Sequence, residues 1–116
     1  MGSLVEDKSF DFAVSIVKLC RYLAEAKREF VLSNQLLRSG TSIGANISEA
    51  QQAQSNADFI AKMNISLKEA AESKYWIRLL EAAEILSNSI TQPLFEECVE
   101  IEEMLYSIIR TSKSKK

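Results

Sequence analysis

Histidine is missing from this sequence of 116 residues, and glycine and proline are scarce. Without histidine the chain cannot form Ser-His or Cys-His nucleophilic sites, imidazole metal ligands or a histidine pH switch. The Glu-x-x-His motif of di-iron helical bundles is excluded for the same reason. Three glycines and one proline leave few positions for turns, so we expect long helices joined by few connections.

Cysteine occurs only at Cys20 and Cys98, too few for a disulfide scaffold or a zinc site. We interpret both as small buried hydrophobic residues of a protein in a reducing cytoplasm. No apolar run approaches the roughly 18 residues of a membrane helix, and the N-terminus has no charged-then-apolar signal. The sequence therefore predicts a cytoplasmic protein that does not associate with membranes.

The composition is that of a globular protein, with 47% hydrophobic residues, 26% charged residues and a net charge of −2. At this length we expect one domain that spans the whole chain. Basic residues gather at the C-terminus, so residues 1–109 hold ten basic and sixteen acidic groups, a net charge of −6. An acidic body disfavours binding to nucleic acid, which depends on neutralising phosphates.

Apolar residues recur at helical spacing in four segments, which we expect to form helices at about residues 9–28, 33–52, 55–88 and 93–110. The tail 111–116 is expected to be disordered. Four amphipathic helices with short links predict an all-α fold, the antiparallel up-down four-helix bundle. The residues predicted to be buried in its core are Leu36, Ile43, Ile47, Leu67, Leu105 and Ile108.

The second of these helices contains a glycine-bearing stretch, residues 39–46, that could instead be a loop. A phosphate-binding loop would need a Gly-Lys-Ser/Thr ending or a preceding strand, and neither is present. A helix is favoured by a heptad seam with steps of four and three residues through Leu36, Gly40, Ile43, Ile47 and Ala50. Gly40 and Gly44 would then mark a flank where another helix approaches closely.

A polar stripe follows the other side of this helix and consists of Gln35, Arg38, Ser42, Asn46 and Glu49. Arginine can clamp a carboxylate or a phosphate, and asparagine offers both a donor and an acceptor. From the spacing alone, a solvated helix face is the alternative. If the stripe is architectural, Arg38 should pair with a carboxylate from another helix or subunit, the candidates being Glu69, Glu72 and Glu49 of a neighbour.

The third helix changes its apolar side near Ser73. Two interpretations are open: a local bend that keeps one continuous core, or two different neighbours, one of which is another subunit. The second predicts an exposed apolar surface, which usually marks an interface. The predicted oligomer interface consists of Tyr75, Trp76, Leu79, Ala83 and Leu86.

No catalytic site is predicted. Five glutamates of the fourth helix could hold a divalent cation, but they spread around the helix, and a solvated face is favoured. Serine and threonine are plentiful, yet without histidine none is a credible nucleophile. We therefore expect a protein that is not an enzyme and that needs no metal or cofactor.

Residues 33–50, SNQLLRSGTSIGANISEA, resemble the signature of the bacterial four-helix bundle proteins. These are also called intervening-sequence proteins, because some are encoded within inserts in large-subunit ribosomal RNA genes. The segments 10–14, 58–60 and 66–70 fit the same family, although Ala50 replaces the glycine usual after the motif's glutamate. The family's motif positions fall on Gln35, Arg38, Ser42, Ile43, Asn46, Ile47 and Glu49.

The resemblance implies a bundle that assembles into a ring, commonly a homopentamer. Related accessory variability proteins of diversity-generating retroelements are basic pentamers that bind a reverse transcriptase and nucleic acid. Two functions follow as expectations. The first is a non-catalytic assembly protein whose ring presents a surface to a protein partner. The alternative is a nucleic-acid-linked accessory factor that binds a reverse transcriptase or ribosomal RNA, a role that the acidic body disfavours.

Overall fold

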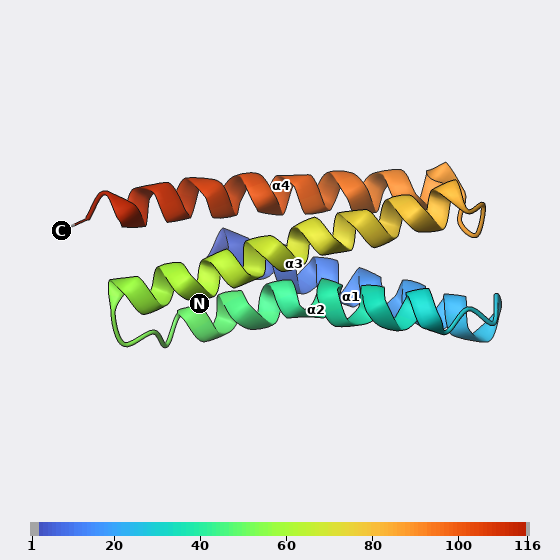
Figure 1. Ribbon diagram of the computed structural model, residues 1–116, viewed down its shortest axis with the longest axis horizontal. Coiled ribbons are helices and arrows are strands. Elements are labelled where there is room, and N and C mark those ends of the chain that lie inside the picture. Colours follow the sequence, from blue (N-terminus) through green and yellow to red (C-terminus); the bar gives the residue numbers. More distant parts are fainter. Residues whose placement is uncertain (1–2, 116) are drawn as a thin grey trace.

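The computed structural model describes residues 3–115 and contains four helices that lie side by side (Figure 1). They are α1 (Leu4–Glu25), α2 (Val31–Ala50), α3 (Asn56–Ala82) and α4 (Asn88–Lys113). No strand occurs in this range, which confirms the predicted all-α class. None of the described helices has an apolar stretch long enough to cross a membrane.

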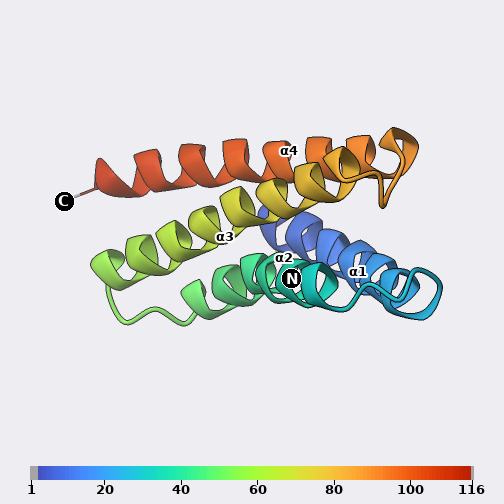
Figure 2. The ribbon, with the colours of Figure 1, turned by 45° about the vertical axis from the view of Figure 1, so that its right-hand side comes forward.

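Successive helices pack against each other and run in opposite directions, as expected for an up-down bundle (Figure 1). The pairs α1–α2, α2–α3 and α3–α4 make most of the contacts, and α1 touches α4 much less. α3 crosses the molecule, so that its start lies beside α2 and its end lies beside the start of α4 (Figure 2). α1 and α3 are not neighbouring helices and lie diagonally across the bundle.

α1 begins at Leu4, earlier than the predicted residue 9, because a capping box precedes it. Ser3 Oγ accepts a hydrogen bond from the Glu6 N–H at 3.2 Å, and Glu6 Oε1 accepts one from the Ser3 N–H at 3.0 Å. The helix ends at Glu25 rather than at residue 28, since Arg28 adopts a left-handed conformation with a φ of 56°. Both ends thus differ from the prediction for local reasons.

The ends of α3 and α4 also differ from the prediction. α3 ends at Ala82 instead of residue 88, and the chain turns through Glu84, whose φ is 63°. α4 begins at Asn88, which places Pro93 inside the helix rather than at its start. The expected disorder from residue 111 is wrong for residues 111–113, which are helical, and Ser112 O accepts a hydrogen bond from Asn56 Nδ2 at 2.8 Å. Lys116 lies outside the described residues.

Gly40 and Gly44 allow α1 to approach α2 closely, as predicted. A Cβ atom on Gly40 would lie 2.9 Å from Cγ2 of Ile16, and one on Gly44 would lie 3.2 Å from Oγ of Ser9. Ile16 is completely buried, so it has little room to move away. Residues 39–46 are helical, and the loop interpretation of this stretch is therefore excluded.

The core contains most of the residues predicted for it. Four of the six are completely buried, namely Leu36, Ile43, Ile47 and Leu105. The other two are partly buried at its edge, and in α4 the buried position is Ile109 instead of Ile108. The heptad seam of α2 is thus confirmed as the inner side of that helix.

α3 keeps one inner side along its length, and this side includes two serines. Its buried residues step by three and four through Met63, Ser66, Ala70, Ser73, Ile77 and Leu80. Ser66 Oγ donates to the Ile43 carbonyl at 2.8 Å, and the hydroxyls of Ser73 and Ser39 are hydrogen-bonded at 2.9 Å. α3 therefore stays packed in its own bundle beyond Ser73, and the apolar residues of its outer side are additional to that seam.

Candidate functional site

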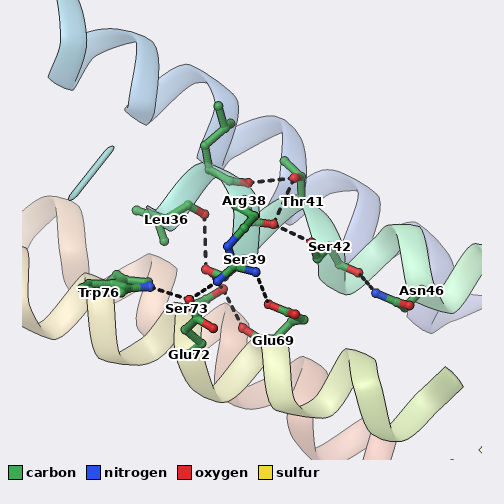
Figure 3. Close-up of polar contacts among 11 residues, drawn as sticks. Leu36, Arg38, Ser39, Thr41, Ser42, Asn46, Glu69, Glu72, Ser73 and Trp76 are labelled. Atoms are coloured by element: carbon green, nitrogen blue, oxygen red, sulfur yellow. Dashed lines mark hydrogen bonds and ion pairs between the residues drawn. The ribbon is translucent and has the colours of Figure 1, made fainter. Parts of the chain in front are cut away.

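The polar stripe of α2 lies along the boundary with α3 (Figure 3). Arg38 bridges two carboxylates of α3: its Nη1 is 3.1 Å from Glu69 Oε1, and its Nη2 contacts Glu72 Oε2. The predicted pairing of Arg38 with a carboxylate from another helix is confirmed, and both partners belong to the same chain. Arg38 thus ties the two helices together at the surface, with about half of its side chain exposed.

Glu72 accepts hydrogen bonds from two side chains. Trp76 Nε1 donates to its Oε2 at 2.9 Å, and the Arg38 guanidinium donates to the same oxygen. The Trp76 bond and then the Arg38 bond lower the pKa of the Glu72 carboxyl below its ordinary value. The pKa of Arg38 is raised, chiefly by its hydrogen bond with Glu72. The ionised forms of both groups are therefore stabilised by this contact.

Three further residues of the stripe also have partners within the chain. Ser42 Oγ donates to the Arg38 carbonyl at 2.6 Å, and Asn46 Nδ2 donates to the Ser42 carbonyl at 2.8 Å (Figure 3). Glu49 pairs with Lys62 of α3, with 3.1 Å between Oε1 and Nζ. Gln35 is exposed and makes no side-chain hydrogen bond within residues 3–115. Apart from Gln35, every residue of the stripe has a partner within the chain, and Arg38 and Glu49 reach α3.

Residues 40–44, GTSIG, match the Gly-x-Ser-x-Gly pattern of hydrolase nucleophiles. In that motif the serine stands on a strained turn between a strand and a helix. Here Ser42 lies in the middle of α2, and its hydroxyl donates to a backbone carbonyl. With no histidine in the chain to act as its base, the pattern does not form a nucleophilic site.

Both cysteines are buried thiols, as predicted. Cys20 Sγ donates to the Ser33 carbonyl at 3.3 Å, and Cys98 Sγ donates to the Ala70 carbonyl at 3.2 Å. Burial raises the pKa of both thiols, that of Cys98 to about 12. At neutral pH both are protonated, whereas a nucleophile or a metal ligand must be a thiolate.

Two of the five glutamates considered on α4 are paired with lysines. Glu102 lies 2.7 Å from Lys74 Nζ, and Glu100 lies 2.9 Å from Lys8 Nζ. Among the residues that the structure describes, no three Cys, Asp or Glu side chains come close enough together to hold a metal ion. Glu100 and Glu102 therefore act as partners of neighbouring helices.

The residues of the predicted oligomer interface occupy two different environments. Tyr75 is 58% exposed, Ala83 is exposed, and Trp76 and Leu79 are partly exposed on the outer side of α3. Leu86 lies instead in the core of its own chain. α3 ends at Ala82, and the chain then turns inward, so Leu86 does not lie on the outer side of α3.

Tyr75 and Leu79 line an open groove between the end of α3 and the start of α4. We define the α3 groove by its lining residues, which are Tyr75, Ile77, Arg78, Leu79, Glu81, Ala82, Gln92 and Phe95. Tyr75 packs edge-on against Trp76, with 5.0 Å between ring centroids, and Lys74 Nζ lies 5.7 Å from the centroid of Phe95. The groove therefore combines apolar side chains with the polar side chains of Arg78, Glu81 and Gln92.

A second apolar surface, which the sequence analysis missed, lies on the outer side of α1. Phe10, Val14 and Val17 are 67%, 39% and 37% exposed, and their spacing of four and three residues places them on one face. We call these three residues the α1 ridge. α1 contacts α2 through Ser9 and Ile16, which lie on another side of the helix. Helical spacing alone does not decide which of two overlapping apolar stripes of α1 faces the core.

Comparison with known proteins places the fold and motif in one family. Residues 3–107 match the family described as "23S rRNA-intervening sequence protein". A crystal structure from Bacteroides thetaiotaomicron, described as a protein with unknown function from the S23 ribosomal protein family, is 53% identical with a TM-score of 0.90. The alignment covers 91% of this chain and 98% of that one. No curated protein matches the chain. The chain belongs to the 23S rRNA-intervening sequence protein family.

Proposed function

We propose that this chain is a non-catalytic assembly protein, which associates with copies of itself into a ring and presents a surface to a protein partner. The main support is the α3 groove, where Tyr75, Leu79 and Phe95 leave apolar surface uncovered within the described chain. Apolar side chains gathered in one exposed place usually mark an interface. The groove is therefore the surface through which copies associate.

The polar chemistry supports a non-catalytic role. The side chains that could act on a substrate already have partners: Arg38 holds Glu69 and Glu72, and Ser42 is bonded to its own helix. The two thiols are buried and protonated. Catalysis needs an activated group within reach of a substrate, and these contacts leave the candidates inactive.

A ring is supported by the presence of two different apolar surfaces. A closed ring of identical subunits uses a head-to-tail contact, in which each copy offers two unlike faces. The α1 ridge and the α3 groove are two such faces on helices that are not neighbours in the bundle. The resemblance to ring-forming bundle proteins, commonly pentamers, agrees with this arrangement.

A nucleic-acid-linked accessory role is the alternative, and the family description, which mentions 23S rRNA, favours it. The charge of the chain opposes it, since residues 1–109 carry a net charge of −6. Titration with RNA and DNA at several salt concentrations separates the two functions. The assembly role predicts no affinity, whereas the accessory role predicts an affinity that falls steeply with salt.

The proposed assembly is tested by measuring molar mass with light scattering. The wild-type protein should exceed the 13.0 kDa of one chain. Leu79→Glu should shift the mass toward 13.0 kDa with its helicity retained, because it places an unpaired charge in the contact. Tyr106→Glu is the control: Tyr106 is 55% exposed at the other end of α4, and its variant should keep the wild-type mass. A wild-type protein that stays monomeric at micromolar concentration would contradict the proposal.

A further inference from the structure

We propose that the α1 ridge of one copy docks into the α3 groove of the next copy. This inference rests on the self-association proposed above and names the two faces that meet. It makes the contact head-to-tail: each copy uses its ridge toward one neighbour and its groove toward the other. The occupant of the groove is therefore α1 of a second copy of this chain.

The placement of the two faces fits this role. α1 and α3 are not neighbouring helices and lie diagonally across the bundle, so occupation of one face leaves the other free. The ridge points away from the contacts of α1, because Ser9 and Ile16 face α2 and Lys8 reaches Glu100 of α4. The groove lies between the end of α3 and the start of α4. Figure 2 shows these two segments side by side.

The two faces also match in shape and polarity. The ridge is a row of apolar side chains, one per helix turn, led by the highly exposed Phe10. The groove is concave and lined by Leu79, Phe95 and the small side chain of Ala82. An apolar helix face laid into an apolar groove is a common mode of recognition between protein segments.

Charges around the two faces are complementary. Asp7 and Asp11 precede the centre of the ridge, and Lys18 and Arg21 follow it. The groove has the opposite order, with Arg78 within it and Glu84 just beyond the end of α3. Glu81 also lines the groove, and its carboxylate accepts hydrogen bonds from Asn88 and Thr91.

Apart from Glu81, these charged side chains are exposed, and none forms an ion pair within residues 3–115. Lys18 follows Asp11 by seven positions, and Glu84 follows Arg78 by six, although Glu84 lies in the turn after α3. We place an α1 helix in the same direction as α3, which pairs Asp11 with Arg78 and points Lys18 toward Glu84. Complementary charges at an interface fix its orientation and exclude wrong partners.

A mixing experiment tests this pairing. Val14→Glu breaks the ridge and leaves the groove intact, whereas Leu79→Glu breaks the groove and leaves the ridge intact. Each variant alone should have the mass of one chain, 13.0 kDa. An equimolar mixture retains one good ridge and one good groove, so its mass by light scattering should double and rise no further.

Other outcomes would overturn the pairing. If the wild type assembles but the mixture keeps the mass of its separate components, the ridge and the groove do not meet. If Leu79→Glu alone forms a dimer that Val14→Glu does not, the ridges pair with each other. A monomeric wild type would instead refute the proposed function, and the pairing with it.

A charge exchange gives a second test that does not depend on buried positions. Asp11→Lys and Arg78→Glu change exposed side chains, so both variants should fold normally. Each alone should raise the concentration for half-assembly on the order of tenfold through like-charge repulsion. The double variant in one chain restores opposite charges and should recover wild-type assembly. Failure of this recovery, with both single variants weakened, would contradict the proposed orientation.

Discussion

The outer sides of α2 and α3 differ in what their side chains do. On α2, Arg38, Ser42, Asn46 and Glu49 all have partners inside the chain. On α3, Tyr75 and its neighbours leave apolar surface exposed beside a groove. The difference teaches that Arg38 and Glu49 of the family signature tie α2 to α3, whereas the exposed apolar surface lies outside the signature.

The physical reason for this division lies in the two kinds of contact. A bridging arginine fixes how two helices lie against each other, and a hydroxyl bonded to its own helix offers few free groups to a partner. The exposed part of an apolar groove contributes nothing to folding of the single chain and gains free energy only when another surface covers it. Changes on α2 should therefore affect stability, and changes on the outer side of α3 should affect assembly.

The largest effect is expected at the inner seam of α2. Ile43 is completely buried, and Ile43→Ala should lower the free energy of unfolding by about 2–5 kcal/mol through lost burial and a cavity. Ile65→Ala on α3 is the control, because Ile65 is 42% exposed and should cost far less. Denaturant unfolding of both variants measures the difference. Equal losses would contradict the proposed bundle register.

A smaller loss is expected when the bridge between α2 and α3 is removed. Arg38→Ala breaks two partly exposed ion pairs and should cost about 1 kcal/mol, since exposed pairs contribute less than buried ones. Glu49→Ala removes a more exposed pair with Lys62 and should cost less than about 0.5 kcal/mol. Thermal unfolding measures both. If Arg38→Ala keeps full stability but loses binding to a protein partner, the stripe is a recognition surface.

The smallest effect is a difference in pH dependence between two carboxylates. The pKa of Glu72 is lowered by Trp76 and then Arg38, so the advantage of wild type over Glu72→Gln should hold at neutral pH. It should shrink as the pH falls below the ordinary value of 4.5 toward the pKa of the folded state.

Glu97 should show the opposite sign. Burial raises its pKa, with Glu100 and Asp11 adding to the rise and Lys8 opposing it. Glu97→Gln should therefore stabilise the protein at neutral pH and lose that advantage as the pH falls through the raised pKa. Unfolding midpoints across the acid range check both variants. Parallel curves for Glu72→Gln and Glu97→Gln would contradict the assigned contacts.

The sequence predicts the class of the fold and the inner side of α2, because a heptad seam that includes Gly40 favours a helix over a loop. It does not predict the inner side of α3, where the buried Ser66 and Ser73 interrupt the apolar pattern and are satisfied by hydrogen bonds to α2. It also misplaces the helix ends at Arg28 and Glu84. Both residues adopt left-handed conformations without being glycine, so the sequence carries no stop signal.

The candidate site was predicted in part for similar reasons. The pairing of Arg38 with Glu69 and Glu72 was predicted because Arg38 is a motif position, with Glu49 of a neighbour as a further candidate. The α1 ridge was missed because Val17 shares its spacing with core residues, and the rotation of α1 is set by tertiary packing. Leu86 was placed on the outer side because the end of α3 at Ala82 was not foreseen.

The most direct test of this division is the molar mass of Arg38→Ala and Leu79→Glu, measured side by side by light scattering at the same concentration. The account predicts that Arg38→Ala keeps the wild-type mass, because its contacts lie within one chain. Leu79→Glu should fall to the 13.0 kDa of a single chain. An Arg38→Ala protein that dissociates while Leu79→Glu stays assembled would contradict the account.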